Sequence, residues 1–212
     1  MNKYTDPHFD RSALITIDTQ NDFTLPDAPV RIAGTEEVIP NMVRLLRSYR
    51  KQGLPIIHIV RLYSGDGSNV DICRKQIVEE GRSMVVPDSE GAELVDELKP
   101  DASIRLNTRK LLSGKAQMLG YNEFVMYKPR WGAFYKTKLE EFLKELDIDT
   151  LVFSGCNYPN CPRTSIYEAS ERDFRIVLAR DAISQLYPKA EEEMKNIGAS
   201  LLSTDEIEKA LA

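Results

Sequence analysis

Histidine and cysteine are scarce in this 212-residue sequence, which contains two histidines and three cysteines. His8 and His58 lie far apart, and the C-x4-C pair Cys156 and Cys161 has no neighbouring histidine or further cysteine that would complete a zinc site. We therefore expect no bound metal and no cofactor. An odd number of cysteines, the third being Cys73, favours free thiols over a disulfide framework.

Long apolar runs and an excess of basic residues are also missing. No stretch approaches the roughly 18 apolar residues of a membrane helix, and the first twelve residues lack the apolar segment of a signal peptide. The net charge of −5 disfavours a general nucleic-acid surface. We expect a cytoplasmic protein that binds neither nucleic acid nor membranes, and the charge says nothing about which small molecule it binds.

Short apolar runs alternate with amphipathic segments along the chain. The runs predict strands at 13–17, 54–60, 123–127, 150–154, 175–179 and 200–202. The helical periodicity predicts helices at 36–51, 91–98, 137–146 (capped by Thr137), 161–173 and 188–197, and from Thr204 onward. This alternation predicts a doubly wound α/β fold, with a mostly parallel sheet of about six strands and helices on both faces. With no repeat and no flexible linker, we expect one domain over residues 1–212.

Two long polar stretches, 61–90 and 100–122, interrupt this alternation. Long connections in compact domains are often lids or binding loops. Decoration of the surface, or a contact between subunits, is an equal alternative.

Three residues with reactive side chains follow predicted strands. Asp18 follows the first strand, Lys128 follows the third, and Cys161 follows the fourth after a turn at 155–160. Ligands of open parallel sheets gather beyond the carboxyl ends of the strands. We therefore expect the three side chains at one edge of the sheet.

Cys161 stands where a helix is predicted to begin. Unpaired N–H groups in the first helical turn would stabilise a thiolate, which lowers the pKa of the thiol, and they could also bind an oxyanion. The alternative is a small, buried apolar side chain. Position alone does not decide between them.

Asp18 and Lys128 each have a catalytic and a structural interpretation. Asp18 could accept the thiol proton and pass it to a leaving amine, or it could be a turn aspartate; Asp22 is a competing candidate that we place in a loop. Lys128 could hold the carboxylate and thiolate together, or it could be a solvated lysine. Arg130 is a second cation, either structural or facing the substrate.

Several segments resemble the isochorismatase-like cysteine hydrolases. LITIDTQNDF at 14–23 is similar to the family's strand and D-x-Q-x-D-F motif, and GLPIIHIVR at 53–61 to its second strand. The segment 127–155, which begins YKPRWGAF, is similar to the K-x-R-x-S-A-F region. In 155–184, which begins GCNYPNCPR, Cys161 lies six residues after a strand-ending glycine, as the family nucleophile does. The resemblance covers most of 12–203.

The resemblance implies a three-layer isochorismatase-like sandwich in which Asp18, Lys128 and Cys161 are catalytic. It implies a non-proline cis peptide between Cys156 and Asn157, and an oxyanion hole formed by the N–H groups of Asn157 and Cys161. Cys156, a rival nucleophile, would lie at the strand exit. Family members commonly form homodimers or homotetramers, and we expect the same here.

The sequence also departs from family patterns. Nicotinamidases carry an Asp-x-His pair and further metal-binding histidines, whereas the residue two places after His58 is Val60, so nicotinamide is a poor substrate candidate. True isochorismatases lack the nucleophile, so Cys161 favours attack on a carbonyl. Pro159, Pro162 and Arg163 are unusual in a turn that normally reads G-x-x-T-x-x-C, and they leave the acyl pocket undefined.

Together these features predict a cysteine hydrolase that cleaves a C–N bond of a small amide or ureido compound through a thioester. Phe23 and Trp131 could wall the substrate slot or pack in the core. Arg61 could pair with a substrate carboxylate or with a structural acid. A non-catalytic binding or assembly protein of the same fold, and a thiol redox protein that uses Cys156 and Cys161, are the two other classes.

Overall fold

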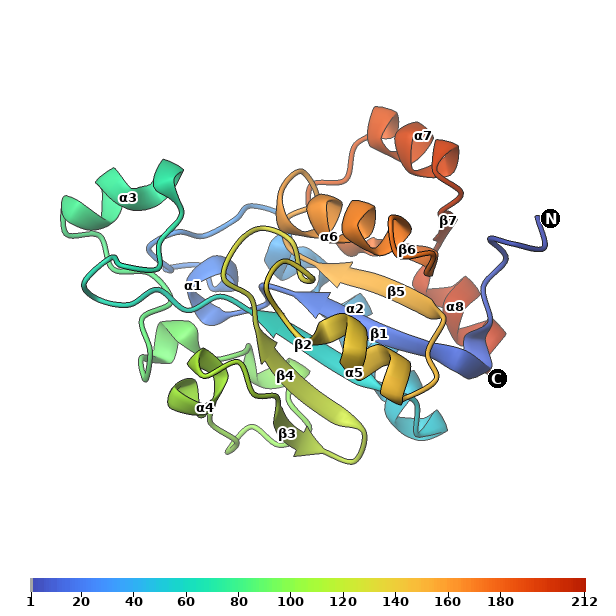
Figure 1. Cartoon of the computed structure of the whole chain (residues 1–212), viewed down its shortest axis with the longest axis horizontal. Coiled ribbons are helices and arrows are strands. Elements are labelled where there is room, and N and C mark those ends of the chain that lie inside the picture. The colour runs from blue at the N-terminus through green and yellow to red at the C-terminus, as the bar shows by residue number, and fades with distance from the viewer. Residues whose placement is uncertain (1) are drawn as a thin grey trace.

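The computed structural model describes residues 2–212 and is built around a seven-stranded sheet (Figure 1). The strands are β1 (Ser12–Ile17), β2 (Ile56–Val60), β3 (Gln117–Gly120), β4 (Glu123–Tyr127), β5 (Thr150–Gly155), β6 (Arg175–Ile183) and β7 (Ser200–Leu202). Their order is β3-β4-β2-β1-β5-β6-β7. Only the β3–β4 pair is antiparallel among the described strands. The predicted doubly wound, mostly parallel α/β fold is confirmed.

Helices of very different lengths join these strands. The helices are α1 (Asn21–Thr24), α2 (Thr35–Gln52), α3 (Ile72–Glu79), α4 (Thr108–Leu112), α5 (Leu139–Glu145), α6 (Cys161–Ser170), α7 (Pro188–Asn196) and α8 (Thr204–Leu211). Short 3₁₀ turns lie at Phe9–Arg11, Glu90–Ala92 and Asp96–Leu98. Within residues 2–212, no helix combines the length and the apolar character that a bilayer span needs.

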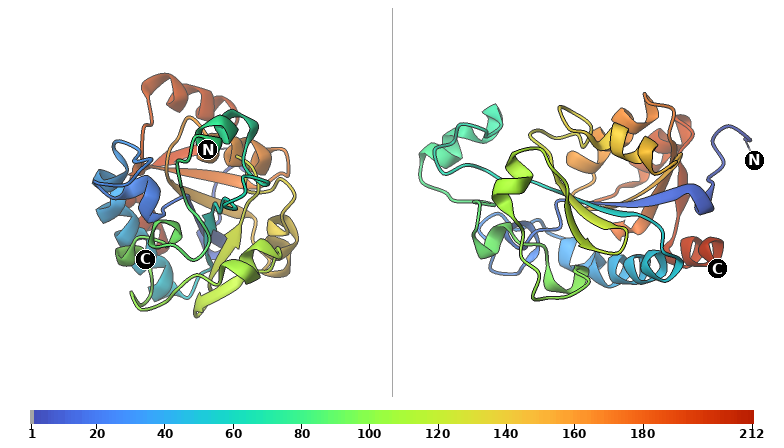
Figure 2. Two further views of the ribbon diagram at one scale, coloured as in Figure 1. Left: turned by 90° about the vertical axis from the view of Figure 1, so that its left-hand side faces the viewer. Right: turned by 60° about the horizontal axis from the view of Figure 1, so that its bottom comes forward.

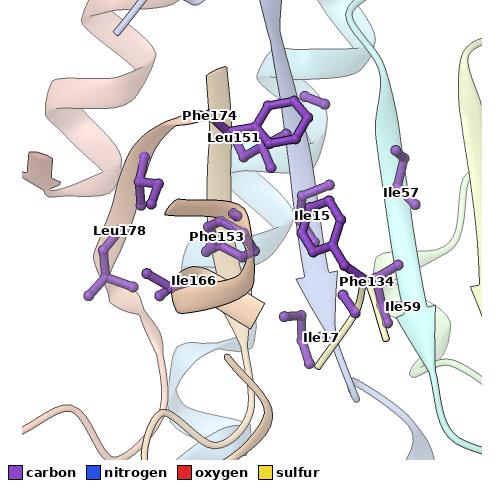
Figure 3. Close-up of a cluster of buried hydrophobic side chains, with 14 of the residues drawn as sticks. Ile15, Ile17, Ile57, Ile59, Phe134, Leu151, Phe153, Ile166, Phe174 and Leu178 are labelled. Carbon is purple, nitrogen blue, oxygen red and sulfur yellow. The ribbon is translucent and has the colours of Figure 1, made fainter. Parts of the chain in front are cut away.

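The helices form a layer on each face of the sheet (Figure 2, right). Apolar side chains of α2 and α8 pack on one face, and those of α5, α6 and α7 pack on the other. Strand β1 runs between these layers and is buried along its whole length. Its side chains alternate: Leu14 contacts the α2 layer, whereas Ile15 and Ile17 pack with Phe153 of β5 and Ile166 of α6 (Figure 3).

The prediction of about six strands missed β3, which lies inside the stretch 100–122 that we predicted to be a connection. β3 is a four-residue edge strand whose residues are all partly or fully exposed, and Met118 is largely in solvent. Such a strand needs neither a continuous apolar run nor a regular alternation, so its sequence does not distinguish it from a loop.

The helix predicted at 91–98 is wrong, because two 3₁₀ turns occupy this segment with extended backbone at Glu93 between them. Tertiary hydrogen bonds favour the extended form. The side chain of Gln20 donates to the carbonyl of Ala92 (2.7 Å), and Gln20 forms an isolated bridge with Leu94. The Glu93 carboxylate accepts the N–H of Leu106.

The predicted cap of α5 is also wrong by one residue. Lys138 occupies the N-cap position, and the Thr137 hydroxyl accepts the N–H of Leu139 at 3.3 Å from one residue further out. The other predicted helices are present with shifted ends.

Candidate active site

The three reactive residues that the sequence places after separate strands meet at one edge of the sheet. The ammonium Nζ of Lys128 lies 2.9 Å from Oδ2 of Asp18 and 3.2 Å from Sγ of Cys161. All three side chains are buried. Figure 1 shows β1 and β5 pointing toward the side of the molecule where α1 and α3 lie, and Figure 2 (left) looks onto that side.

Backbone geometry at the ends of β1 and β5 brings Asp18 close to the turn that precedes Cys161. Asp18 has a φ of 53°, in the left-handed region, and its N–H donates to the carbonyl of Ile59 (2.9 Å). Gly155 has a φ of 117°, and a Cβ there would lie 2.3 Å from the carbonyl oxygen of Ile17. Only glycine therefore allows the two strand ends to approach so closely.

Cys161 is the first residue of α6, and Pro162 follows it in the first turn, where no N–H is needed. The peptide bond between Cys156 and Asn157 is cis. Within residues 2–212, the N–H groups of Asn157 and Cys161 donate to no backbone carbonyl. Two free N–H groups thus lie in the turn that carries the thiol.

Burial dominates the acidity of the Cys161 thiol. Burial, and to a lesser degree the negative charge of Asp18, raise the pKa of Cys161 to about 12 although the positive charge of Lys128 opposes them. The prediction of a lowered thiol pKa is therefore wrong, because desolvation outweighs the cation and the helix terminus. The resting group is a thiol, which needs a base before it can act as a nucleophile.

Asp18 has the free acceptor that such a base requires. Its Oδ2 binds Lys128, while the buried Oδ1 has no hydrogen-bond partner within residues 2–212.

The neighbouring Cys156 has different contacts. Its thiol donates to the main-chain carbonyl of Asp18 at 2.9 Å, and burial raises the pKa of Cys156 well above the ordinary value. Of the two neighbouring thiols, Cys161 is the one in contact with Lys128.

A narrow pocket of about 10 Å³, roughly the space that one water molecule needs, lies beside Cys161. Its walls contain all the residues that the sequence proposed for catalysis, oxyanion binding and substrate contact, apart from Lys128. Those residues are Asp18, Phe23, Arg61, Trp131, Asn157 and Cys161. This volume is far below the range for small-molecule sites, because the side chains of the wall nearly fill the pocket.

Arg61 lines this cavity, but it is already paired with a structural acid. Its guanidinium forms a buried ion pair with Asp71 and donates to the hydroxyl of Tyr63 (2.9 Å) and to the carbonyl of Lys128 (3.2 Å). Of the two alternatives for Arg61, the structural acid is the one found. The arginine therefore ties the segment 61–90 to the end of β4.

Cys156, the rival nucleophile, also lines the cavity, whereas the remaining sequence candidates lie outside it. The Asp22 carboxylate accepts the N–H of Val85 (2.6 Å), and Arg163 pairs with Glu193 (3.0 Å). Arg130 is largely exposed, with Nε 3.8 Å from Asp71. Cys73 is exposed on α3, and all three cysteines are free, as predicted.

Neither histidine lies in the cavity. His8 contacts Asp149 (2.8 Å), and His58 is buried between Thr16 and Glu123. Residues 2–212 contain no cluster of three or more His, Cys, Asp or Glu side chains that could hold a metal ion.

Sequence reasoning missed four residues of the cavity wall: Ile32, and Tyr63, Asp71 and Arg74 from the segment 61–90. Asp71 immediately precedes α3, a position typical of a helix N-cap, although its side chain makes no capping bond. A possible N-cap at Asp71 was therefore the sequence signal for helix α3. This helix places Arg74 in the cavity wall.

Comparisons with known proteins identify similar chains. A family model described as the isochorismatase domain matches residues 12–206. A crystal structure of an isochorismatase family protein from Desulfovibrio vulgaris is 31% identical, with a TM-score of 0.80, over 95% of this chain and 98% of the other.

Two curated relatives are each 28% identical. One, named a probable inactive nicotinamidase of Arabidopsis thaliana, aligns over 95% of this chain and 96% of its own length. The other is an N-carbamoylsarcosine amidase of Arthrobacter, which aligns over 84% of this chain and 61% of its own length. The chain thus spans somewhat under two thirds of the amidase.

Proposed function

The chain belongs to the isochorismatase family, and from this premise we propose that it cleaves the C–N bond of a small amide or ureido compound with Cys161 as the nucleophile. The observation that carries the proposal is the position of Lys128, whose ammonium is within hydrogen-bond distance of both Asp18 and Cys161 in a buried pocket. An acid, a thiol and a cation in such contact are the parts that nucleophilic acyl transfer requires.

The proposed reaction begins with proton transfer. Asp18 accepts the proton of Cys161, and the sulfur attacks the carbonyl carbon of the substrate. The N–H groups of Asn157 and Cys161 stabilise the negative charge that develops on the carbonyl oxygen. Lys128 keeps the carboxylate and the sulfur in place and compensates their charge.

Collapse of the tetrahedral intermediate breaks the C–N bond. Asp18 returns its proton to the leaving nitrogen, which departs as ammonia or an amine, and a thioester on Cys161 remains. Water then attacks the thioester while Asp18 accepts one proton from it. The C–S bond breaks, the acid product leaves, and the proton on Asp18 restores the thiol.

The relatives support a small substrate of this class. The pocket beside Cys161 has a volume of only about 10 Å³, so even a compound of few heavy atoms must displace side chains of its wall in order to bind. The amidase relative is named for N-carbamoylsarcosine, a ureido compound. Another relative is named a probable inactive nicotinamidase, and it supports the alternative of a non-catalytic protein of the same fold. A screen for hydrolysis distinguishes an active hydrolase from a non-catalytic protein.

The test is a panel of small amides and ureides screened for ammonia release. We expect Cys161→Ala to lower kcat/KM by about a thousandfold or more, as loss of a nucleophile does. Cys156→Ala, which removes the rival thiol, should retain activity within about tenfold. A Cys161→Ala protein with full activity would exclude the mechanism. A wild-type protein that releases ammonia from no compound in the panel would favour the non-catalytic alternative.

The same preparations test the redox alternative. Mass spectrometry of the oxidised protein would detect a bridge between Cys156 and Cys161, which the hydrolase mechanism does not use.

A further inference from the structure

We propose that Arg74 and Trp131 form an anion subsite in the cavity beside Cys161, so that the compound cleaved there carries a carboxylate. This inference rests on the proposed hydrolase function and names the class of substrate for that site. It assigns the role that the sequence suggested for Arg61 to a different arginine.

Arg74 is placed by helix α3. This helix lies beyond the carboxyl ends of the strands (Figure 1), and Arg74 lines the same cavity wall as Asp18, Trp131 and Cys161. The guanidinium carbon of Arg74 lies 5.3 Å from the centroid of the Trp131 ring. Stacking on an indole holds a guanidinium plane in a fixed orientation while leaving its N–H edges free to donate.

The charges around the cavity show which cation is free. Asp18 is neutralised by Lys128, and Asp71 by Arg61, both through buried ion pairs. Arg74 has no carboxylate within 4.0 Å among the side chains of residues 2–212. Its guanidinium contacts the sulfur of Met84 at 3.7 Å, and a thioether is a weak acceptor. One uncompensated positive charge therefore faces the cavity.

Arg130 does not compete for this role. Its guanidinium donates to the carbonyls of Asn69 and Pro129, and its Nε lies 3.8 Å from Asp71. It is also absent from the cavity wall. Of Arg61, Arg74 and Arg130, only Arg74 both lines the cavity and lacks an acidic partner among the described residues.

A carboxylate is the group that fits this subsite. A guanidinium presents paired N–H donors that match the two oxygens of a carboxylate. A substrate with its amide or ureide carbonyl at Cys161 and its carboxylate at Arg74 would contact both groups that line the pocket. A neutral amide leaves the arginine unpaired, and a cationic amide is repelled by it.

The test uses two thiol reagents of similar size that differ in charge. Iodoacetate carries a carboxylate and iodoacetamide does not, and the alkylation rate of Cys161 with each is measured by peptide mass spectrometry with fragmentation to locate the label. In Arg74→Gln we expect the ratio of the iodoacetate rate to the iodoacetamide rate to fall about tenfold, the size of one hydrogen bond to a charged group. Lys75→Gln removes the same charge from the next residue of α3 and is the matched control.

Each outcome decides the question. A ratio unchanged in Arg74→Gln, or lowered equally in Lys75→Gln, overturns the subsite. Arg74→Lys keeps the charge without the paired donors, and we expect its ratio to lie between those of the wild type and Arg74→Gln; it also replaces Arg74→Gln if that variant does not fold.

Alkylation requires no turnover, so the two proposals can fail separately. If no amide is hydrolysed but the ratio falls, the hydrolase proposal fails and the anion subsite stands. If acidic and neutral amides are hydrolysed equally well and the ratio does not change, the subsite fails and the hydrolase stands.

Discussion

The two ends of strand β4 carry two buried charged clusters that differ in how fully their polar atoms are paired. Glu123 begins the strand, and both of its oxygens are bound: Arg50 donates to each at 2.7 Å, and His58 contacts Oε1 at 3.0 Å. Lys128 follows the strand, and the carboxylate of its partner Asp18 keeps one oxygen without a hydrogen bond from any residue of the described part of the chain, 2–212.

This difference separates a structural cluster from a reactive one. A buried network in which every donor and acceptor is paired stabilises one arrangement and has no site for another proton. A buried carboxylate oxygen without a donor, beside a thiol that burial keeps protonated, can receive a proton. Charge and burial alone do not distinguish the two clusters, whereas the count of unpaired atoms does.

The largest expected effect is on catalysis at the Lys128 end. Asp18→Asn preserves shape but removes the proton acceptor, so we expect kcat/KM on any amide substrate to fall about a thousandfold, within the range for loss of a general base. Steady-state ammonia release measures it. Asp22→Asn is the matched control, because Asp22 binds the Val85 N–H outside the cavity. Equal losses in the two variants would remove the distinction between these carboxylates.

The next effect is on stability at the Glu123 end. Glu123→Gln leaves Arg50 and His58 without their buried anion, and we expect the free energy of unfolding to fall by about 3 kcal/mol. Urea denaturation measures it. Glu36→Gln breaks an exposed pair with Arg31 and should change stability by less than about 1 kcal/mol. A Glu123→Gln protein as stable as the wild type would show that this cluster is not structural.

The pH dependence of the same variant gives a second readout. Burial alone would raise the pKa of Glu123, but hydrogen bonds from Arg50 and His58 outweigh it and lower the pKa from 4.5 to about 2. The stabilisation by Glu123 is therefore complete above about pH 4.5 and is lost as the pH falls toward 2. We expect the difference in unfolding free energy between wild type and Glu123→Gln to shrink across this window.

The sequence predicted the reactive end of β4 better than the structural end. Strands that end at Asp18, at Lys128 and before Cys161 must place those residues at one edge of a parallel sheet, so their convergence follows from topology. The partners of Glu123 come from α2 and β2, and nothing in the sequence near Glu123 indicates them. The pairing of Glu123 with Arg50 and His58 depends on distances between elements in the folded structure, which the apolar periodicity of the sequence does not reveal.

The cavity wall marks a second limit of the sequence. Arg61 follows a strand, as the catalytic residues do, yet Asp71, ten residues later, returns to pair with it. The sequence predicted that the Arg61 side chain lies at a strand end. It did not predict that another residue of the chain pairs with that side chain. The pKa of Cys161 was mispredicted for a related reason, since the depth of burial outweighs the nearby positive charge of Lys128.

The smallest effect concerns the thiol itself and tests whether the cluster around Lys128 works as one electrostatic unit. The charge of Asp18 raises the pKa of Cys161 and the charge of Lys128 lowers it. Asp18→Asn should therefore lower the thiol pKa, and Lys128→Met should raise it, each by about one unit, which corresponds to about 1.4 kcal/mol. The measurement is the pH at which iodoacetamide alkylation of Cys161 reaches half of its limiting rate.

Opposite shifts in the two variants are the decisive result, because loosened packing would expose the thiol and lower its pKa in both. Glu123→Gln, at the far end of β4, is the control and should leave the alkylation profile of Cys161 unchanged. If Lys128→Met lowered the thiol pKa, solvent exposure would dominate over the charge of Lys128. The cation would then contribute packing to the site instead of charge compensation, and the contrast between the two ends of β4 would no longer rest on electrostatics.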